Sequence, residues 1–189
     1  MKNRTPLFIL GGLVALVVII GAFFWTTYNS LVSSSQAADA QWAQVQTQLQ
    51  RRFDLIPNLV ESVKGIFNQE RAVFDAIAQA RTRYSGAQTT DQKAQAAGQV
   101  ESALARLLVV VENYPEIRSQ KNVTQLMDEL AGTENRIAVE RGRYNTSVLS
   151  YNNNVRRFPG NIVAGMFGFA PRAYFEAAPG AETPPKVQF

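Results

Sequence analysis

The stretch VTQLMDELAGTENRIAVERGRYNTSVLSYNNNVRR, residues 123–157, decides the fold of this 189-residue chain. A stripe of mostly apolar residues recurs in it at steps of three or four for more than thirty residues. That spacing is the period of an α-helix with one face turned toward a core, and the length suits a helix of a bundle. The stripe consists of Leu126, Leu130, Thr133, Ile137, Glu140, Tyr144, Val148, Tyr151, Val155 and Phe158. Pro159 and Gly160 end the predicted helix.

Two further helical segments precede this stretch. The first covers about residues 33–84, and Pro57 inside it predicts a kink or a break at the preceding residue. The second covers about residues 91–113 and ends before Pro115. No segment shows the alternation of a strand. The sequence therefore predicts an all-α fold, with an antiparallel bundle of three to four long helices over residues 29–158.

The N-terminal stretch LFILGGLVALVVIIGAFFW, residues 7–25, contains no charged residue. As a helix, it spans roughly 28 Å, close to the thickness of the hydrocarbon core of a bilayer. Trp25 and Tyr28 at its far end suit the headgroup region. We therefore expect a transmembrane helix over residues 7–25. Nothing between Trp25 and Val45 forces a break, so this helix is expected to continue into the bundle.

Two other interpretations of the apolar stretch are a buried core helix and a cleavable signal peptide. A core helix is disfavoured because no polar face interrupts the run. The apolar part of a signal peptide is shorter and ends at small residues, whereas large aromatic residues follow Gly21 and Ala22 here. A retained anchor is therefore favoured.

The charges around the anchor predict its direction. Lys2 and Arg4 lie in the N-terminal residues 1–6, while Asp39 is the only charged residue among the twenty that follow Trp25. Basic residues favour the cytoplasmic side of a membrane. We therefore expect residues 1–6 in the cytoplasm and the C-terminal domain in the extracytoplasmic, periplasmic space.

Composition argues against several classes of function. Cysteine and histidine are both absent, which disfavours zinc and copper sites and excludes Ser-His-Asp and Cys-His machinery within one chain. Two of the 19 basic residues precede the anchor, so 17 basic residues face 15 acidic ones in the rest of the chain. This near balance gives no reason to expect nucleic-acid binding. We therefore predict no enzyme, no catalytic residue, no metal, no cofactor and no small-molecule substrate.

The segment after the bundle, residues 159–176, is apolar but too short and too broken by Gly and Pro to span a membrane. It is expected to pack on the bundle, to contact another subunit or to dip into the bilayer interface. Its candidate interaction residues are Ile162, Met166, Phe167, Phe169, Tyr174 and Phe175. Residues 177–189 are rich in Pro and Ala and are expected to be extended. They end in Phe189, which a PDZ-type domain could bind as an added strand.

Two polar groups along the helices are further candidates for interaction. Arg51, Arg52 and Asp54 form either a partner-binding surface or a solvated helix face, where each ion pair contributes less than about 1 kcal/mol. A Tyr-Asn pair recurs after seven residues, at Tyr144-Asn145 and Tyr151-Asn152, so both tyrosines lie on one face. The tyrosines suit packing between helices or a homo-oligomer interface. Glu140, which falls on the apolar stripe, is expected to bury against an arginine and fix helix register.

Four blocks of residues resemble the LemA family of bacterial membrane proteins, and the resemblance runs from the anchor to the tail. The blocks are residues 28–32; residues 50–60 and 63–65; residues 134–137 with Arg141, Tyr144, Asn145, Tyr151 and Asn152; and Phe158 and Pro159 with residues 167–169. The resemblance implies an antiparallel bundle of long helices on an N-terminal anchor in the bacterial inner membrane. It transfers no catalytic residue.

These observations lead to two functional hypotheses, beside a third, an enzyme, which would require a pocket lined by converging carboxylates. In the first, the protein is a membrane-anchored helical scaffold that forms a homo-oligomer or organises other envelope proteins at the inner membrane. In the second, it is a monomeric envelope sensor or adaptor that binds a protease or a signalling protein. In both, the lipid bilayer is a partner.

Overall fold

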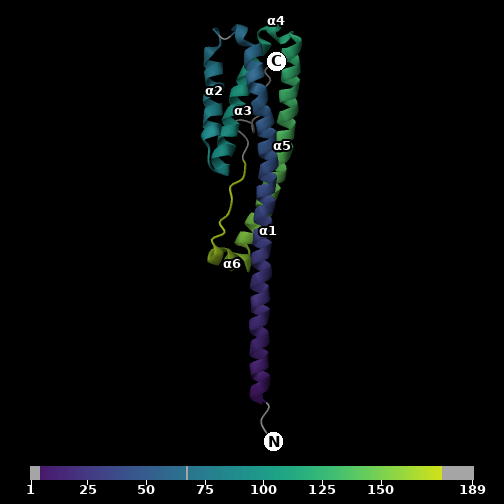
Figure 1. Ribbon diagram of the computed structural model, residues 1–189, viewed down its shortest axis with the longest axis vertical. Helices are drawn as coiled ribbons and strands as arrows, with labels where there is room; N and C mark the ends of the chain where they lie inside the picture. The colour runs from purple at the N-terminus through teal and green to yellow at the C-terminus, as the bar shows by residue number, and fades with distance from the viewer. Residues whose placement is uncertain (1–4, 67, 176–189) are drawn as a thin grey trace, which may run out of the picture. The chain divides into compact units, whose positions relative to one another are not determined.

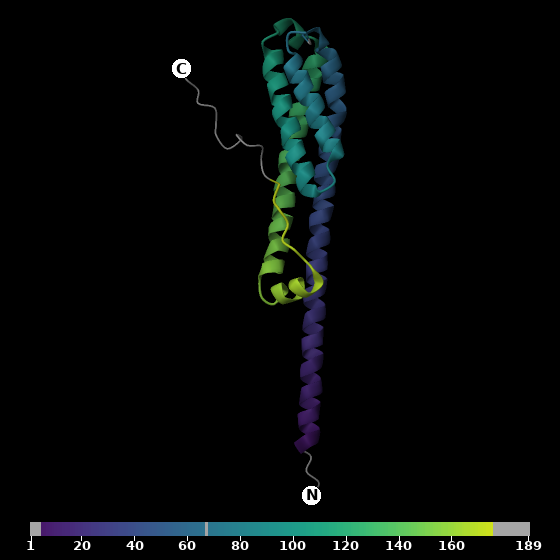
Figure 2. The same cartoon turned by 90° about the vertical axis from the view of Figure 1, so that its left-hand side faces the viewer.

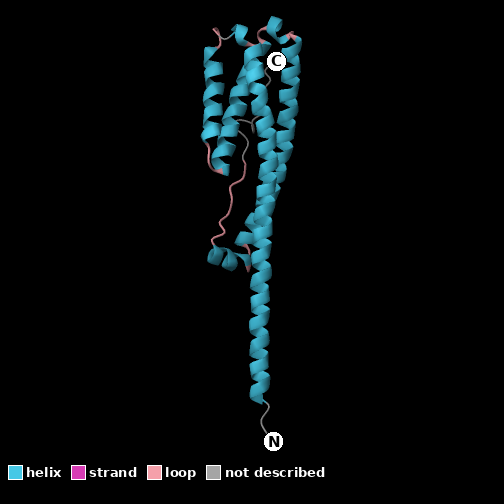
Figure 3. Ribbon diagram, in the orientation of Figure 1, coloured by secondary structure: helices cyan, strands magenta, loops and turns pink. Residues whose placement is uncertain are grey.

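The computed structural model describes residues 5–66 and 68–175, with side chains from Leu10 onward. The described residues form helices and connections without any strand (Figures 1 and 3). This confirms the all-α prediction. The elements are α1 (Thr5–Ser62), the 3₁₀ turn η1 (Lys64–Ile66), α2 (Arg71–Gly86), α3 (Thr90–Glu112), α4 (Pro115–Arg118), α5 (Lys121–Arg156) and α6 (Gly160–Phe167).

The described residues form two compact units. The anchor unit contains residues 5–40 and 146–172, and the bundle unit contains residues 41–145, apart from residue 67, together with residues 173–175. Both α1 and α5 contribute a part to each unit.

The bundle unit contains four long helical segments that alternate in direction, with η1 and the short helix α4 between them. The C-terminal part of α1 and α3 run one way, and α2 and the N-terminal part of α5 run the other way (Figures 1 and 2). Each segment turns an apolar face inward, as its three-and-four spacing predicts. Their buried side chains include Val45, Leu49, Ile56, Leu59, Phe74, Ile77, Val100, Leu104, Leu107, Val123, Leu130 and Ile137. The predicted antiparallel bundle is therefore confirmed, with four segments.

The chain does not break at Pro57, so that part of the prediction was wrong. Pro57 lies inside α1 on its exposed face, and the helix continues to Ser62. Proline costs a helix about 3 kcal/mol, but Ile56 and Leu59 beside it are fully buried and their packing outweighs this cost. The turn comes later, where the backbone N–H of Ile66 donates to the carbonyl of Val63 at 3.1 Å in the 3₁₀ geometry of η1.

The anchor unit contains the first part of α1, the end of α5 and α6, which runs across α1 in Figure 2. Its core consists of Leu31, Tyr151, Val155, Val163 and Ala164, and the half-buried rings of Phe24, Tyr28 and Phe169 pack against it. Residues 1–4 of the predicted cytoplasmic segment and residues 177–189 of the predicted tail lie outside the described residues.

Candidate interaction surfaces

The largest exposed apolar surface lies on the first part of α1. The helix is long and apolar enough to cross a membrane, and 0% of its most apolar 18-residue window is buried. A water-exposed band of this size is unusual for a soluble protein, whereas side chains that contact lipid tails are apolar without interruption. Its exposed large side chains are Leu10, Leu13, Val14, Leu16, Val17, Val18, Ile19, Ile20, Phe23 and Trp25. The N-terminal helix therefore fits a membrane anchor, and it continues into the bundle unit without a break.

A second exposed apolar surface covers α6 and the residue before Pro159. We call it the α6 patch, and it consists of Phe158, Ile162, Met166 and Phe167. The opposite side of α6 is buried through Val163 and Ala164. The predicted post-bundle candidates therefore divide: Ile162, Met166, Phe167 and Tyr174 are exposed, Phe169 is half-buried and Phe175 is buried.

The residues of the predicted Arg51-Arg52-Asp54 group also differ in exposure. Arg51 and Asp54 lie on the exposed face of α1, where Asp54 accepts a hydrogen bond of 2.8 Å from the Gln50 side chain. Arg52 is only 6% exposed and forms an ion pair with Glu134 of α5. Arg52 therefore belongs to the interior of the bundle, and the exposed surface retains Arg51 and Asp54.

The Arg52–Glu134 pair is part of a larger charged cluster in the bundle unit. Glu101 of α3 is hydrogen-bonded to Glu134, and the charges of Arg52 and Arg141 act on the carboxyl group of Glu101. Burial, followed by the charge and hydrogen bond of Glu134, raises the pKa of Glu101, while the two arginines oppose this rise. Glu101 was not predictable from the sequence, because residues from three distant segments meet here and no local spacing links them.

Replacing Glu101 with glutamine is expected to stabilise the protein at neutral pH. A carboxyl whose pKa is raised on folding binds more protons in the folded state, so stability falls as pH rises from its unfolded value through its folded value. Glu101→Gln keeps a hydrogen-bond donor for Glu134 and removes this loss; because Glu101 is only half-buried, solvent screening limits the gain to about 0.5 kcal/mol. Denaturant unfolding between pH 4 and pH 8 measures it. Glu112→Gln, at an exposed position of the same helix, is the control, and lower stability of Glu101→Gln at pH 7 would contradict the assignment.

The first Tyr-Asn pair binds the backbone of the segment after α6 within the bundle unit. The Asn145 side chain donates to the carbonyl oxygen of Phe175 at 3.0 Å and accepts from its N–H at 2.8 Å. The Phe175 ring lies 5.8 Å from the ring of Trp42, which is 5.3 Å from the ring of Tyr144. The guanidinium of Arg141 lies 5.8 Å from the Phe175 ring. Phe175 is thus fixed through both its backbone and its ring.

The second Tyr-Asn pair repeats this arrangement within the anchor unit. The Asn152 side chain donates to the carbonyl oxygen of Arg172 at 2.9 Å and accepts from its N–H at 2.8 Å. The Tyr151 hydroxyl donates to the carbonyl oxygen of Ala170 at 3.0 Å. The guanidinium of Arg172 binds both carboxylate oxygens of Asp39, at 2.6 and 3.0 Å, and its Nη2 lies 2.9 Å from the Ser35 hydroxyl oxygen.

In both arrangements the Tyr-Asn repeat holds the segment after α6. The sequence predicted the packing of the tyrosines but not the hydrogen bonds of the asparagines. Tyr144 and Tyr151 are buried, as the interpretation of packing between helices expects. Each asparagine amide satisfies both backbone groups of one extended residue, as a neighbouring strand would. The spacing of the tyrosines was visible in the sequence, but the partners of the asparagines lie 20 and 30 residues away.

Replacing either asparagine is expected to loosen the segment that it holds. Asn145→Ala and Asn152→Ala each leave two backbone groups of a half-buried segment without partners, at a cost of about 2 kcal/mol. Hydrogen exchange should accelerate at Phe175 in the first variant and at Arg172 in the second. Asn135→Ala, at an exposed position of α5, should leave both amides unchanged. Unchanged exchange in the two variants would exclude this role.

Comparison with known proteins agrees with this architecture. The LemA family profile matches residues 41–189. The chain is similar to Magnetosome protein MamQ 2 of Paramagnetospirillum magneticum, with 28% identity over 194 residues that cover 89% of this chain and 71% of that protein. It is 26% identical to Magnetosome protein MamQ of Magnetospirillum gryphiswaldense over 83% of this chain and 67% of that protein. It is also 23% identical to Protein LemA of Metamycoplasma hominis over 86% of this chain and 76% of that protein. The chain is therefore a member of the LemA family.

Proposed function

We propose that this protein is a non-enzymatic scaffold, anchored in the bacterial inner membrane by α1, that self-associates or organises partner proteins. The observation that carries the proposal is the continuity of α1. This single helix runs from Thr5 to Ser62, and it is exposed and apolar at its start and buried among the bundle helices at its end. Membership in the LemA family supports a membrane-associated helical protein.

The absence of a loop in α1 matters for the proposed role. No loop separates Trp25, at the end of the apolar part, from Trp42, the first buried residue of α1 in the bundle unit. Each anchor therefore carries its bundle unit on the same helix, and association of several anchors within the membrane would raise the local concentration of the bundle units.

A non-enzymatic role is supported by the chemistry of the described surfaces. A hollow of about 410 Å³ between α2 and α3 is lined in part by Arg83, Gln92, Gln95 and Gln99 and by no carboxylate. The half-buried carboxylates Glu101 and Glu134 are engaged with each other and with arginines. The chain also has no cysteine or histidine. These groups suit binding and structural stability better than proton transfer or nucleophilic attack.

We place the N-terminus of the proposed scaffold in the cytoplasm and the bundle unit in the periplasmic space. Lys2 and Arg4 before the anchor support this direction, because the next charged residue in the chain is Asp39. The exposed residues Arg51 and Asp54 are then available to other envelope proteins.

Cysteine crosslinking in intact cells tests the proposed scaffold, since the chain has no native cysteine to interfere. Single cysteines along residues 13–20 of the full-length protein should give dimers with a helical period, and light scattering in detergent should show an oligomer. Val139→Cys, exposed on α5 in the bundle unit, is the matched position away from the anchor. A monomer at every concentration, with no crosslink at any anchor position, would exclude self-association.

A second candidate function is a monomeric adaptor for a protease or a signalling protein. One observation favours it: the bundle unit exposes few large apolar side chains among its described residues, namely Val109, Val139 and Tyr174. A polar exterior suits transient contacts better than a permanent assembly. Phe189, the proposed C-terminal contact, lies outside the described residues. Crosslinks to foreign proteins that disappear when residues 187–189 are deleted would favour the adaptor.

A further inference from the structure

We propose that the α6 patch is a second membrane contact, which lies in the phospholipid headgroup layer beside the transmembrane part of α1. The partner is the bilayer interface itself, with its anionic headgroups. This inference rests on the proposed function, because it requires α1 to span the membrane. It assigns a specific partner to residues that the anchoring role of α1 leaves unexplained.

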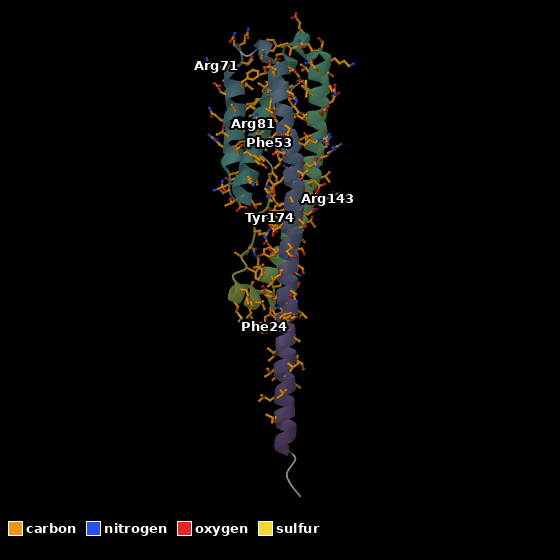
Figure 4. The ribbon with its side chains drawn as sticks, viewed as in Figure 1. Phe24, Phe53, Arg71, Arg81, Arg143 and Tyr174 are labelled. Carbon is orange, nitrogen blue, oxygen red and sulfur yellow. The ribbon has the colours of Figure 1, made fainter. Side chains whose placement is uncertain are left out.

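The position of α6 along α1 is the first argument. The ring of Phe167 lies 4.8 Å from the ring of Tyr28, and Phe24 packs against the same core, beside α6 (Figure 4). Tyr28 is three residues beyond Trp25, or roughly 4.5 Å along the helix, and Leu31, which shares a buried cluster with Val163 of α6, lies just farther, roughly 9 Å beyond Trp25. The headgroup layer on each side of the hydrocarbon core is roughly 5–8 Å thick. The contacts of α6 therefore begin where the apolar run of α1 ends.

The shape of the exposed surface is the second argument. Ile162 and Met166 are four residues apart in α6, so they lie on one face of it, and Phe158 lies in the turn just before the helix; the three are 47%, 66% and 77% exposed. The other side of α6 is fixed to the core of the anchor unit through Val163 and Ala164. A short helix with one side fixed to its own protein and the other apolar and exposed resembles the helices that lie in membrane interfaces. Figure 2 shows α6 running across α1, as a helix parallel to the membrane plane would.

The charge around the α6 patch is the third argument. Arg156 and Arg157, both exposed, directly precede Phe158. The other charged side chains described in the anchor unit, Asp39 and Arg172, pair with each other. The end of α5 therefore carries a net positive charge next to an apolar surface. Anionic phospholipids attract basic residues that lie close to a membrane surface.

A hollow beside the patch provides polar groups at the same level. Its volume is about 390 Å³, and the residues that line it include Thr26, Thr27, Ser30 and Arg157. Hydroxyl and guanidinium groups are common ligands of phosphate oxygens. The hollow and the patch together present hydrogen-bonding groups next to large apolar side chains, as a phospholipid headgroup next to its acyl chains requires. This pairing favours lipid over a second copy of the chain as the occupant.

Spin-label depth measurements on the full-length protein in lipid nanodiscs test the proposal. Single labels at Val18→Cys, Met166→Cys and Val139→Cys report on the anchor, the α6 patch and the bundle surface, all of which are exposed positions. The measured quantity is the ratio of collision rates with oxygen and with a water-soluble nickel complex. The ratio at residue 166 should be several-fold higher than at residue 139 and lower than at residue 18.

The possible outcomes separate this inference from the proposed function. An oxygen-to-nickel collision ratio at residue 166 equal to that at residue 139 would overturn the inference. The membrane anchor of the proposed function would still stand if the label at residue 18 lies in the acyl region. Shielding of residue 166 from both reagents would indicate a protein contact and would also overturn it. A label at residue 18 that is exposed to water would contradict the membrane anchor itself.

A charge variant tests the headgroup contact independently of the apolar patch. In the double variant Arg156→Gln/Arg157→Gln, the label at residue 166 should become more accessible to nickel in nanodiscs that contain phosphatidylglycerol. In pure phosphatidylcholine the variant and its parent should be alike. The control is Arg71→Gln/Arg81→Gln, which removes two exposed charges from α2 of the bundle unit (Figure 4). Equal effects of the two double variants would overturn the assignment of Arg156 and Arg157 to headgroups.

Discussion

Replacement of Arg52 with methionine is expected to lower the free energy of unfolding of the bundle unit by about 3 kcal/mol. The variant removes the cation that pairs with Glu134 inside the bundle and leaves Glu134 and Glu101 hydrogen-bonded side by side. Removal of one partner from a buried pair typically costs about 3–5 kcal/mol, and the lower end applies because the Glu134 side chain remains 35% exposed. Denaturant unfolding in mild detergent, followed by circular dichroism, measures the loss.

The neighbouring residue provides the matched control for this variant. Arg51 has the same side chain on the exposed face of the same helix, so Arg51→Met should change stability by less than about 0.5 kcal/mol. The double variant Arg52→Met/Glu134→Met should recover much of the loss, because apolar residues of similar volume can replace a buried ion pair. The loss in Arg52→Met should also be smaller at pH 5 than at pH 8, since protonation of one carboxyl relieves the repulsion between Glu101 and Glu134. Equal stability of Arg51→Met and Arg52→Met would refute this account.

The long helices were predictable because local spacing determines which residues a helix buries. The stripe over residues 123–157 predicted α5, and its members Leu130, Ile137, Tyr144, Val148 and Tyr151 are buried. The continuity of α1 between Trp25 and Val45 was predictable because nothing in that stretch forces a break. The break expected at Pro57 was wrong because tertiary packing of the adjacent residues outweighed a local preference.

The charged interior was harder to predict because it depends on residues far apart in the sequence. Arg52 follows Leu49 by three residues and precedes Ile56 by four, so its place on the buried stripe was visible, but a charge there suggested a solvated face. Its partner Glu134 is 82 residues away. Glu140 was expected to pair with an arginine and fix helix register. It forms an ion pair of 2.7 Å with Arg143. Because both residues belong to α5, this pair does not connect two helices.

Gly160→Ala is expected to disrupt the start of α6 and to cost about 3 kcal/mol, at the upper end for overpacking because the clash is with backbone. A Cβ atom at position 160 would lie 1.9 Å from the carbonyl oxygen of Asn154, which a small side-chain movement cannot relieve. The connection between α5 and α6 would have to open, and Val163 and Ala164 would lose their contacts with Leu31. Hydrogen exchange should then accelerate throughout α6.

The matched control for Gly160→Ala lies in the same helix. A Cβ atom at Gly165 would meet nothing within 4 Å, so Gly165→Ala should stabilise α6 by about 0.5–1 kcal/mol through the helix propensity of alanine. The two substitutions add the same methyl group to α6 and are expected to have effects of opposite sign. If α6 is held against α1 as proposed, Gly160→Ala should also move a spin label at Met166 from the bilayer interface into water, while Gly165→Ala leaves its depth unchanged. Equal exchange and equal label depth in the two variants would show that the corner at Gly160 does not position α6.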